Sequence, residues 1–233
     1  MSDLIRFVYF DIDDTLLDHR RAERAALADC QAAFPGLGCH DARHVSETYH
    51  AGNAPLWRDY GDGQITKDFL KRERFRKLLA ALDADEDPDT VSDHYLGRYG
   101  AHWSWMEGAE AAYRAVAARY PVGLLTNGFT EQQRGKLARF PLLSDLAKTV
   151  IISEEVGAMK PQPAIFQHAT DAAGVRPDEI LYVGDSLHSD VQGGLGFGWN
   201  VAWFGGDRHR ERASYPDAFA FSDWNDLLAR LEL

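Results

Sequence analysis

The stretch VYFDIDDTLLDH, residues 8–19, decides the fold of this chain, because an apolar run that reaches into it ends abruptly in carboxylates. Residues 5–10 form that run and predict a buried β-strand. Asp11, Asp13 and Asp14 follow at once. Carboxylates this close repel one another unless a positive charge stands between them. The stretch therefore predicts a missing partner, which is a metal cation, a lysine or both.

The composition is that of a soluble globular protein, with 45% apolar and 26% charged residues in 233. A net charge of −11 repels phosphate backbones and disfavours binding to nucleic acid. The two cysteines, Cys30 and Cys39, form no CxxC pair, so disulfide bonds and zinc sites are not expected. The first residues do not resemble a signal peptide, and no apolar run approaches the roughly 18 residues of a membrane span. We expect a cytoplasmic protein without a membrane partner.

From residue 121 onward, short apolar runs alternate with helical segments, a pattern typical of parallel βαβ units. The predicted strands are residues 5–10, 122–128, 149–153, 179–185 and 199–204. Helices are predicted at 129–143 and 162–174, and a short strand followed by a helix from Ser222 or Asp223 ends the chain. We therefore predict an α/β fold, a Rossmann-like doubly wound parallel sheet.

Residues 20–105 differ, because alanine, leucine and charged residues dominate and no long β-branched run occurs. One segment repeats apolar residues at the spacing of an amphipathic helix: Phe75, Leu78, Leu79 and Leu82. Breaks are predicted near residues 36–41, 61–64 and 83–89, which leaves four helices. The interpretation is an all-helical cap domain at 19–105, inserted into an α/β core domain of residues 1–18 and 106–233.

Four predicted strand ends carry reactive polar groups, and ligands of a doubly wound sheet bind at the carboxyl ends of its strands. These groups are Asp11 with Asp13, Thr126 with Asn127, Lys160, and Asp185 followed by Asp190. Carboxylate oxygens suit Mg²⁺, and a lysine can pair with both phosphate and carboxylate. Threonine and asparagine add hydrogen-bond donors. The four groups together predict a site for a phosphoryl group.

The same four segments resemble the motifs of the haloacid dehalogenase-like (HAD) phosphohydrolases. They are DIDDT (11–15), TNG (126–128), KP (160–161) and GDSLHSD (184–190), in that order. The longer segments TNGFTEQQ, SEEVGAMKPQPAIF and GDSLHSDVQGG are similar to the bacterial pyrimidine and nucleoside 5′-monophosphatase branch. That branch carries a helical cap after the first motif, in agreement with the predicted insert.

The resemblance implies a role for each polar residue. Asp11 would be the nucleophile that forms an aspartyl-phosphate. Asp13 would be the general acid for the leaving alcohol and then the base for the hydrolytic water. Thr126 and Asn127 would hold the phosphoryl group. Lys160 would neutralise Asp11 and the transferring phosphate.

The resemblance also implies a Mg²⁺ site. Asp11 and Asp185 would bind the ion through their carboxylates, and Asp13 through its backbone carbonyl. Asp190 would support the waters of the metal ion or Lys160.

Substrate contacts in the cap are harder to assign, because aromatic residues at helical spacing often belong to a core. Trp57, Tyr60, Trp103 and Trp105 invite either interpretation. Residues 58–64 are predicted to form a cap loop that reaches the site, so Arg58 and Tyr60 are the expected substrate contacts.

The expected function is a Mg²⁺-dependent phosphatase for a small phosphorylated metabolite, preferably a nucleoside 5′-monophosphate. Phosphoglycolate or sugar phosphates are alternative substrates, and a sugar-phosphate mutase would use the same catalytic residues. A 2-haloacid dehalogenase would not need Asp13. A non-catalytic binding module would be expected to lose a carboxylate or the lysine. Either a monomer or a homodimer is compatible with the sequence.

Overall fold

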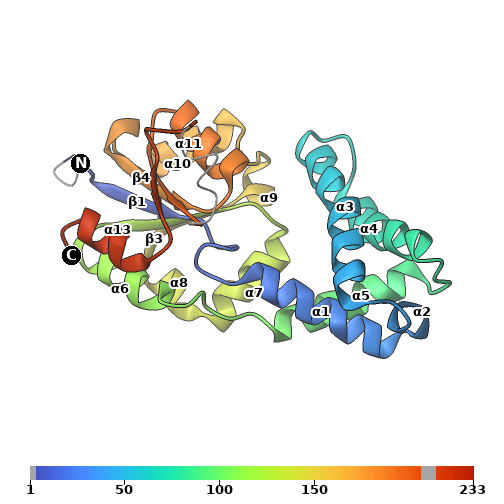
Figure 1. Ribbon diagram of the computed structural model, residues 1–233. Helices are drawn as coiled ribbons and strands as arrows, with labels where there is room; N and C mark the ends of the chain where they lie inside the picture. The colour runs from blue at the N-terminus through green and yellow to red at the C-terminus, as the bar shows by residue number, and fades with distance from the viewer. Residues whose placement is uncertain (1–3, 206–213) are drawn as a thin grey trace. The chain divides into compact units, whose positions relative to one another are not determined.

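The computed structural model describes residues 4–205 and 214–233, and the chain divides into two compact units. One unit comprises Met1–Asp18 and Ser104–Leu233, and the other comprises His19–Trp103. We name them the α/β unit and the helical unit (Figure 1). In the described ranges, we find no helix with the length and apolar character that crossing a bilayer requires.

Within its described residues, the α/β unit contains a parallel sheet of six strands in the order β3-β2-β1-β4-β5-β6. The strands are β1 (Phe7–Phe10), β2 (Val122–Thr126), β3 (Ala147–Ile152), β4 (Ile180–Gly184), β5 (Asn200–Phe204) and β6 (Phe219–Phe221). The chain builds outward from β1 to β3 and then returns to place β4 on the other side of β1. This order confirms the predicted doubly wound α/β class, and it puts the topological switch point beside the end of β1.

Both faces of the sheet are covered, as a fully buried parallel strand requires. Val8 and Phe10 of β1 join an apolar cluster that includes side chains of α6 (Ala109–Arg119) and α13 (Trp224–Arg230). Phe7 and Tyr9 point to the opposite face and join a cluster with α10 (Pro163–Ala173). Figure 1 shows α6 and α13 on one side of the sheet and α10 with α11 (Gly193–Gly196) on the other.

The remaining helical segments among the described residues of this unit are α7 (Thr130–Arg139), α8 (Pro141–Leu146), α9 (Ser153–Val156), η1 (Pro177–Glu179) and the π-helix η2 (Leu187–Gln192). The prediction of one helix over 129–143 was wrong. Pro141 has no N–H to donate, so it starts a new helix at the first position of α8 instead of continuing α7. The helix predicted at 162–174 is confirmed as α10, which is capped after Ala173 by Gly174 in the left-handed conformation (φ 68°).

Residues 19–103, all of which the structure describes, form the helical unit between β1 and β2. Its helices are α1 (His19–Ala33), α2 (Pro35–Gly38), α3 (Ala42–Gly61), α4 (Lys67–Ala81) and α5 (Pro88–Ala101). The predicted break at 36–41 thus contains one further short helix. Phe75, Leu78 and Leu79 form the buried face of α4, as their spacing predicts.

The prediction that residues 58–64 form a loop was wrong for the first four residues. Arg58 and Tyr60 lie in the last turn of α3, which ends only at Gly61. No helix-breaking residue precedes Gly61 in that turn, and the left-handed conformation appears later, at Gly63 (φ 69°).

Gly123 of β2 gives a first prediction, because two buried rings lie against its Cα. A Cβ at this position would meet Tyr9 Cε1 at 2.4 Å and Phe7 Cε1 at 2.9 Å. Tyr9 is itself stacked on Trp199 at 5.3 Å between ring centroids and cannot withdraw easily. We expect Gly123→Ala to lower the free energy of unfolding by about 1–3 kcal/mol in urea denaturation.

The matched control is Gly196→Ala, since a Cβ there would meet no heavy atom of the described residues within 4 Å. That exposed helical position should keep or slightly raise the stability. Equal midpoints for the two variants would show that the rings can move aside.

Candidate active site

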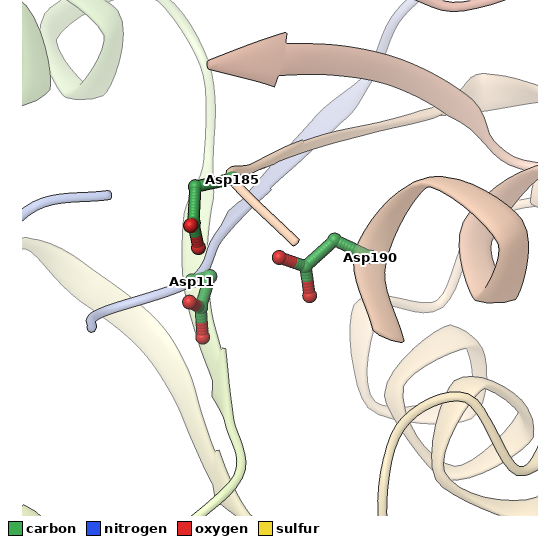
Figure 2. A group of neighbouring side chains, drawn as sticks. All are labelled: Asp11, Asp185 and Asp190. Atoms are coloured by element: carbon green, nitrogen blue, oxygen red, sulfur yellow. The ribbon is translucent and has the colours of Figure 1, made fainter. Parts of the chain in front are cut away.

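Three carboxylates converge where β1 and β4 end. Asp11 follows β1, Asp185 follows β4, and Asp190 lies in η2. Each offers an oxygen, and these oxygens all lie within 4.8 Å of one another. Figure 2 shows the three side chains as neighbours, with the carboxylate of Asp190 directed toward Asp11 and Asp185. The prediction that the polar residues of these strand ends meet at one edge of the sheet agrees with this geometry.

Lys160 supplies the positive charge that the carboxylates in residues 8–19 predicted. Its Nζ donates to Asp11 Oδ1 at 2.7 Å, to Asp190 Oδ1 at 2.8 Å and to the Tyr182 hydroxyl at 2.6 Å. These three acceptors use all three N–H groups of the ammonium. Lys160 and Asp11 are each only 5% exposed, so the ion pair is shielded from water.

Burial raises the pKa of Asp11 to about 7, and the charge of Lys160 opposes that rise. For Lys160, burial acts to lower the pKa, but Asp11 and Asp190 outweigh it and hold the pKa above its ordinary value. The lysine is therefore a permanent cation. A divalent cation beside Asp11 would further favour the ionised carboxylate that a nucleophile requires.

Asn127 fixes the loop that carries the lysine. Its Nδ2 donates to the Lys160 carbonyl, and the Lys160 N–H donates to Asn127 Oδ1, both at 2.9 Å. The hydroxyl of Thr126, which is fully buried, donates to the Asn127 carbonyl at 3.3 Å. The structure thus brings Asn127 to the lysine loop, a contact that the sequence did not predict.

Asp13 follows Asp11 at a spacing of two, with the fully buried Ile12 between them. Its carboxylate accepts from Lys136 Nζ at 2.5 Å and 2.7 Å and from Gln133 Nε2 at 2.8 Å. Both donors come from α7. Sequence reasoning missed them, although a lysine and a glutamine three residues apart on a predicted helix were the available signal.

The donor set fits Mg²⁺, because every candidate ligand is a hard carboxylate or carbonyl oxygen. Asp190 already accepts from Lys160 and Tyr182 through Oδ1 and from the Ser186 N–H through Oδ2. It is therefore better suited to orient the lysine than to bind an ion. Asp11 and Asp185 are the side chains that would hold the cation directly.

Residues 5–198 match the sequence profile of the haloacid dehalogenase-like hydrolases. The chain belongs to this family. Among its relatives, pyrimidine 5′-nucleotidase YjjG of Escherichia coli (strain K12) is 31% identical over 210 residues, which are 88% of each chain. Glyceraldehyde 3-phosphate phosphatase of Pyrococcus abyssi is 30% identical over 206 residues, 86% of this chain and 82% of that protein.

Solved structures share the fold of this haloacid dehalogenase-like hydrolase. The HAD-hydrolase YfnB from Bacillus subtilis, described as bound to magnesium, superposes with a TM-score of 0.83 at 24% identity, over 98% of this chain and 99% of that one. An L-2-haloacid dehalogenase from Xanthobacter autotrophicus with chloropropionic acid covalently bound has a TM-score of 0.72 at 20% identity, over 97% and 98% of the two chains. These two structural similarities are evidence for the fold alone.

Tyr182 of β4 is a member of the site that the sequence did not reveal. Its hydroxyl contacts Lys160 Nζ, Asp190 Oδ1 and the Leu125 carbonyl, the last two at 3.0 Å. A tyrosine in a fully buried strand needs a hydrogen-bond partner for its hydroxyl. This need was the only local feature of the sequence that pointed to Tyr182.

Removing this hydroxyl leaves the buried ammonium of Lys160 with one acceptor fewer. We expect Tyr182→Phe to reduce the free energy of unfolding by about 1–2 kcal/mol in urea denaturation. Tyr215→Phe is the control, because among the described residues it removes an exposed hydrogen bond with Gln192. An equal effect of the two substitutions would mean that the buried hydroxyl adds no stability through Lys160.

The predicted cap residues lie in the helical unit. Arg58 and Tyr60 are on α3, where the Tyr60 ring meets Trp57 at 5.8 Å. Trp103 packs on Tyr99 in the same unit at 5.6 Å. Trp105 is half-buried and packs against the apolar core of the α/β unit, where its ring meets Phe140, in agreement with the core interpretation. A substrate contact by Arg58 or Tyr60 stays a prediction.

Proposed function

We propose that this hydrolase is a Mg²⁺-dependent phosphatase that cleaves small phosphate monoesters through an aspartyl-phosphate on Asp11. The observation that carries the proposal is the buried ion pair of Asp11 with Lys160, beside the carboxylates of Asp185 and Asp190. A nucleophilic carboxylate must stay ionised without water around it, and the lysine makes that possible.

In the first step, an oxygen of Asp11 forms a bond to phosphorus while the bond from phosphorus to the leaving oxygen breaks. Asp13 gives its proton to that leaving oxygen, and an alcohol departs. In the second step, Asp13 takes a proton from the water that attacks phosphorus, so that Asp11 is regenerated and inorganic phosphate is released.

Lys160 neutralises negative charge near Asp11 in both steps, and Thr126 and Asn127 lie at the end of β2 where donors would meet the phosphoryl oxygens. Bound Mg²⁺, held by the Asp11 and Asp185 carboxylates and the Asp13 carbonyl, would supply positive charge to those oxygens.

The second acid separates this proposal from one alternative, a 2-haloacid dehalogenase. A dehalogenase does not need Asp13, yet here two donors of α7 hold that side chain in place. A binding module would have no need for a complete set of carboxylates and lysine. A sugar-phosphate mutase would keep every catalytic residue and would transfer the phosphoryl group to a second hydroxyl instead of water.

We propose a nucleoside 5′-monophosphate as the preferred substrate class. The similarity to a pyrimidine 5′-nucleotidase over 88% of both chains supports this choice. The second candidate is a three-carbon sugar phosphate, supported by the similarity to a glyceraldehyde 3-phosphate phosphatase. The unpaired cysteines, one of them exposed, suit a reducing cytoplasm.

The test is phosphate release from a panel of monoesters, measured with Mg²⁺ and with EDTA. The panel holds pyrimidine and purine nucleoside monophosphates, glyceraldehyde 3-phosphate, phosphoglycolate and hexose phosphates. We expect release that depends on Mg²⁺ and is fastest with nucleotides. Equal rates across the panel would refute the assignment of nucleotides as the preferred substrates. No phosphate release from any member would refute the proposed phosphatase activity.

A further inference from the structure

Helix α7 is joined to the site by two side chains, Lys136 and Gln133, to which the sequence analysis assigned no role. Lys136 contacts both oxygens of Asp13, and Gln133 contacts one of them. The side chain of Lys136 is 2% exposed and that of Asp13 is 23% exposed. A buried ammonium is costly unless it is paired, so this contact with Asp13 is a strong constraint on the carboxylate.

The spacing of Gln133 and Lys136 lets both side chains contact the same carboxylate. Positions 133 and 136 are three apart and therefore lie on the same face of α7. The Gln133 amide also donates to the Asn127 carbonyl at 3.0 Å. It thus connects the strand end after β2 with the carboxylate that follows β1.

Gly128 leaves the room that this connection needs. A Cβ at Gly128 would lie 2.4 Å from Gln133 Nε2 and 3.1 Å from its Cδ. The glycine that ends the TNG segment therefore allows the glutamine amide to lie against the backbone between Asn127 and Asp13. Two sequence features that seemed separate, the glycine and the polar face of the helix, serve one contact.

We propose that Lys136 and Gln133 are positioning residues that fix the Asp13 carboxylate for proton transfer to the leaving group. The ammonium of Lys136 favours an ionised Asp13, so the proton that Asp13 passes to the leaving oxygen comes from the phosphate of the bound ester, whose second pKa is about 6. This inference rests on the proposed function, in which Asp13 protonates the leaving oxygen as the bond to phosphorus breaks. Neither residue needs to contact the substrate. Three hydrogen bonds restrict the carboxylate to one orientation, and proton transfer depends on such geometry.

The position of Asp13 matters only when the leaving group needs a proton. An alcohol leaving as an alkoxide is a poor leaving group, whereas p-nitrophenolate departs without a proton. The informative quantity is the ratio of kcat/KM for p-nitrophenyl phosphate to kcat/KM for uridine 5′-monophosphate, or for the alkyl ester of the panel that the wild type cleaves fastest. The value of kcat/KM covers the steps from substrate binding to departure of the alcohol or nitrophenolate. It therefore reports on protonation of the leaving group and not on the later hydrolysis of the aspartyl-phosphate.

The experiment measures this ratio for the wild type and for the Lys136→Met, Gln133→Met and Asp13→Asn variants, with Mg²⁺ present. We expect Lys136→Met to lower kcat/KM for the alkyl ester by about 10- to 100-fold and to change the nitrophenyl ester by less than about 3-fold. Arg139→Met, an exposed position at the end of the same helix, is the matched control and should leave the ratio unchanged.

A double-mutant cycle shows whether the lysine acts through Asp13. In the Asp13→Asn background, Lys136→Met should alter the ratio no further, because its target is gone. Lys136→Gln, which keeps a donor, should recover part of the alkyl-ester rate. If Lys136→Met does not fold by circular dichroism, the ratio of the milder Gln133→Met variant decides.

The outcomes separate the inference from the proposed function. Wild-type activity on both esters, with an unchanged ratio in folded Lys136→Met or Gln133→Met, overturns the inference alone. An equal loss on both esters does the same, because it shows a general structural role. A wild type that cleaves neither ester overturns the proposed function together with the inference.

Discussion

Asp11→Asn should release phosphate at a rate lower than the wild type by about 10⁴-fold or more, since no other group can replace the attacking oxygen. The substitution keeps the shape of the side chain and leaves Lys160 paired with Asp190. The fold should therefore survive. The loss should be equally large for p-nitrophenyl phosphate, because the nucleophile is needed whatever the leaving group.

The measurement is phosphate release with Mg²⁺, together with circular dichroism to verify the fold. Asp145→Asn, on the exposed surface of α8, makes the same chemical change away from the site and should retain the wild-type rate. A folded Asp11→Asn protein with substantial turnover would refute the assignment of the nucleophile.

Lys160→Met should unfold far more easily than the wild type, because it leaves two buried carboxylates without their cation. Removing one partner of a buried pair costs about 3–5 kcal/mol, and here Asp11 and Asp190 both lose their ion pair. We expect a fall of that size in the free energy of unfolding, measured by urea denaturation at neutral pH without metal, and a loss of phosphatase activity.

The deficit of Lys160→Met should shrink as the pH falls. Burial already raises the pKa of Asp11 to about 7 in the presence of the lysine. A carboxyl whose pKa is higher in the folded state than in the unfolded state favours folding most when it is protonated. That stability is lost as the pH rises above the unfolded pKa of about 3.9 toward the folded value.

Urea denaturation at about pH 5 and about pH 8 tests this pH dependence. Lys148→Met, which removes an exposed lysine of β3, should differ from the wild type by less than about 0.5 kcal/mol at both pH values. A deficit in Lys160→Met that is constant with pH would mean that unpaired carboxylates do not cause it.

The four strand ends could be predicted because each depends on local patterns. A buried run such as residues 5–10 and the carboxylates after it are visible in the sequence alone. Parallel strands then place their carboxyl ends on one edge, so the partners of Asp11 could be sought at the other strand ends. The missing positive charge was correctly expected, and Lys160 provides it.

Errors arose where a local pattern allowed two outcomes. The run from Phe129 to Leu143 has helical character throughout, and only the ring of Pro141 separates α7 from α8. The end of α3 was placed too early because the glycines at 61 and 63 look alike in sequence, although only Gly63 adopts the left-handed conformation.

The sequence by itself determined the sheet, the helical insert and the residue types at the strand ends, because periodicity and abrupt polar residues are properties of neighbouring positions. The tertiary structure alone decided which side chains meet across long separations. Lys136 and Gln133 reach Asp13 over more than 100 residues, and Tyr182 joins Lys160 from another strand. Hydrogen bonds of this kind depend on directions and distances between elements, and these exist only after the sheet and its helices have packed.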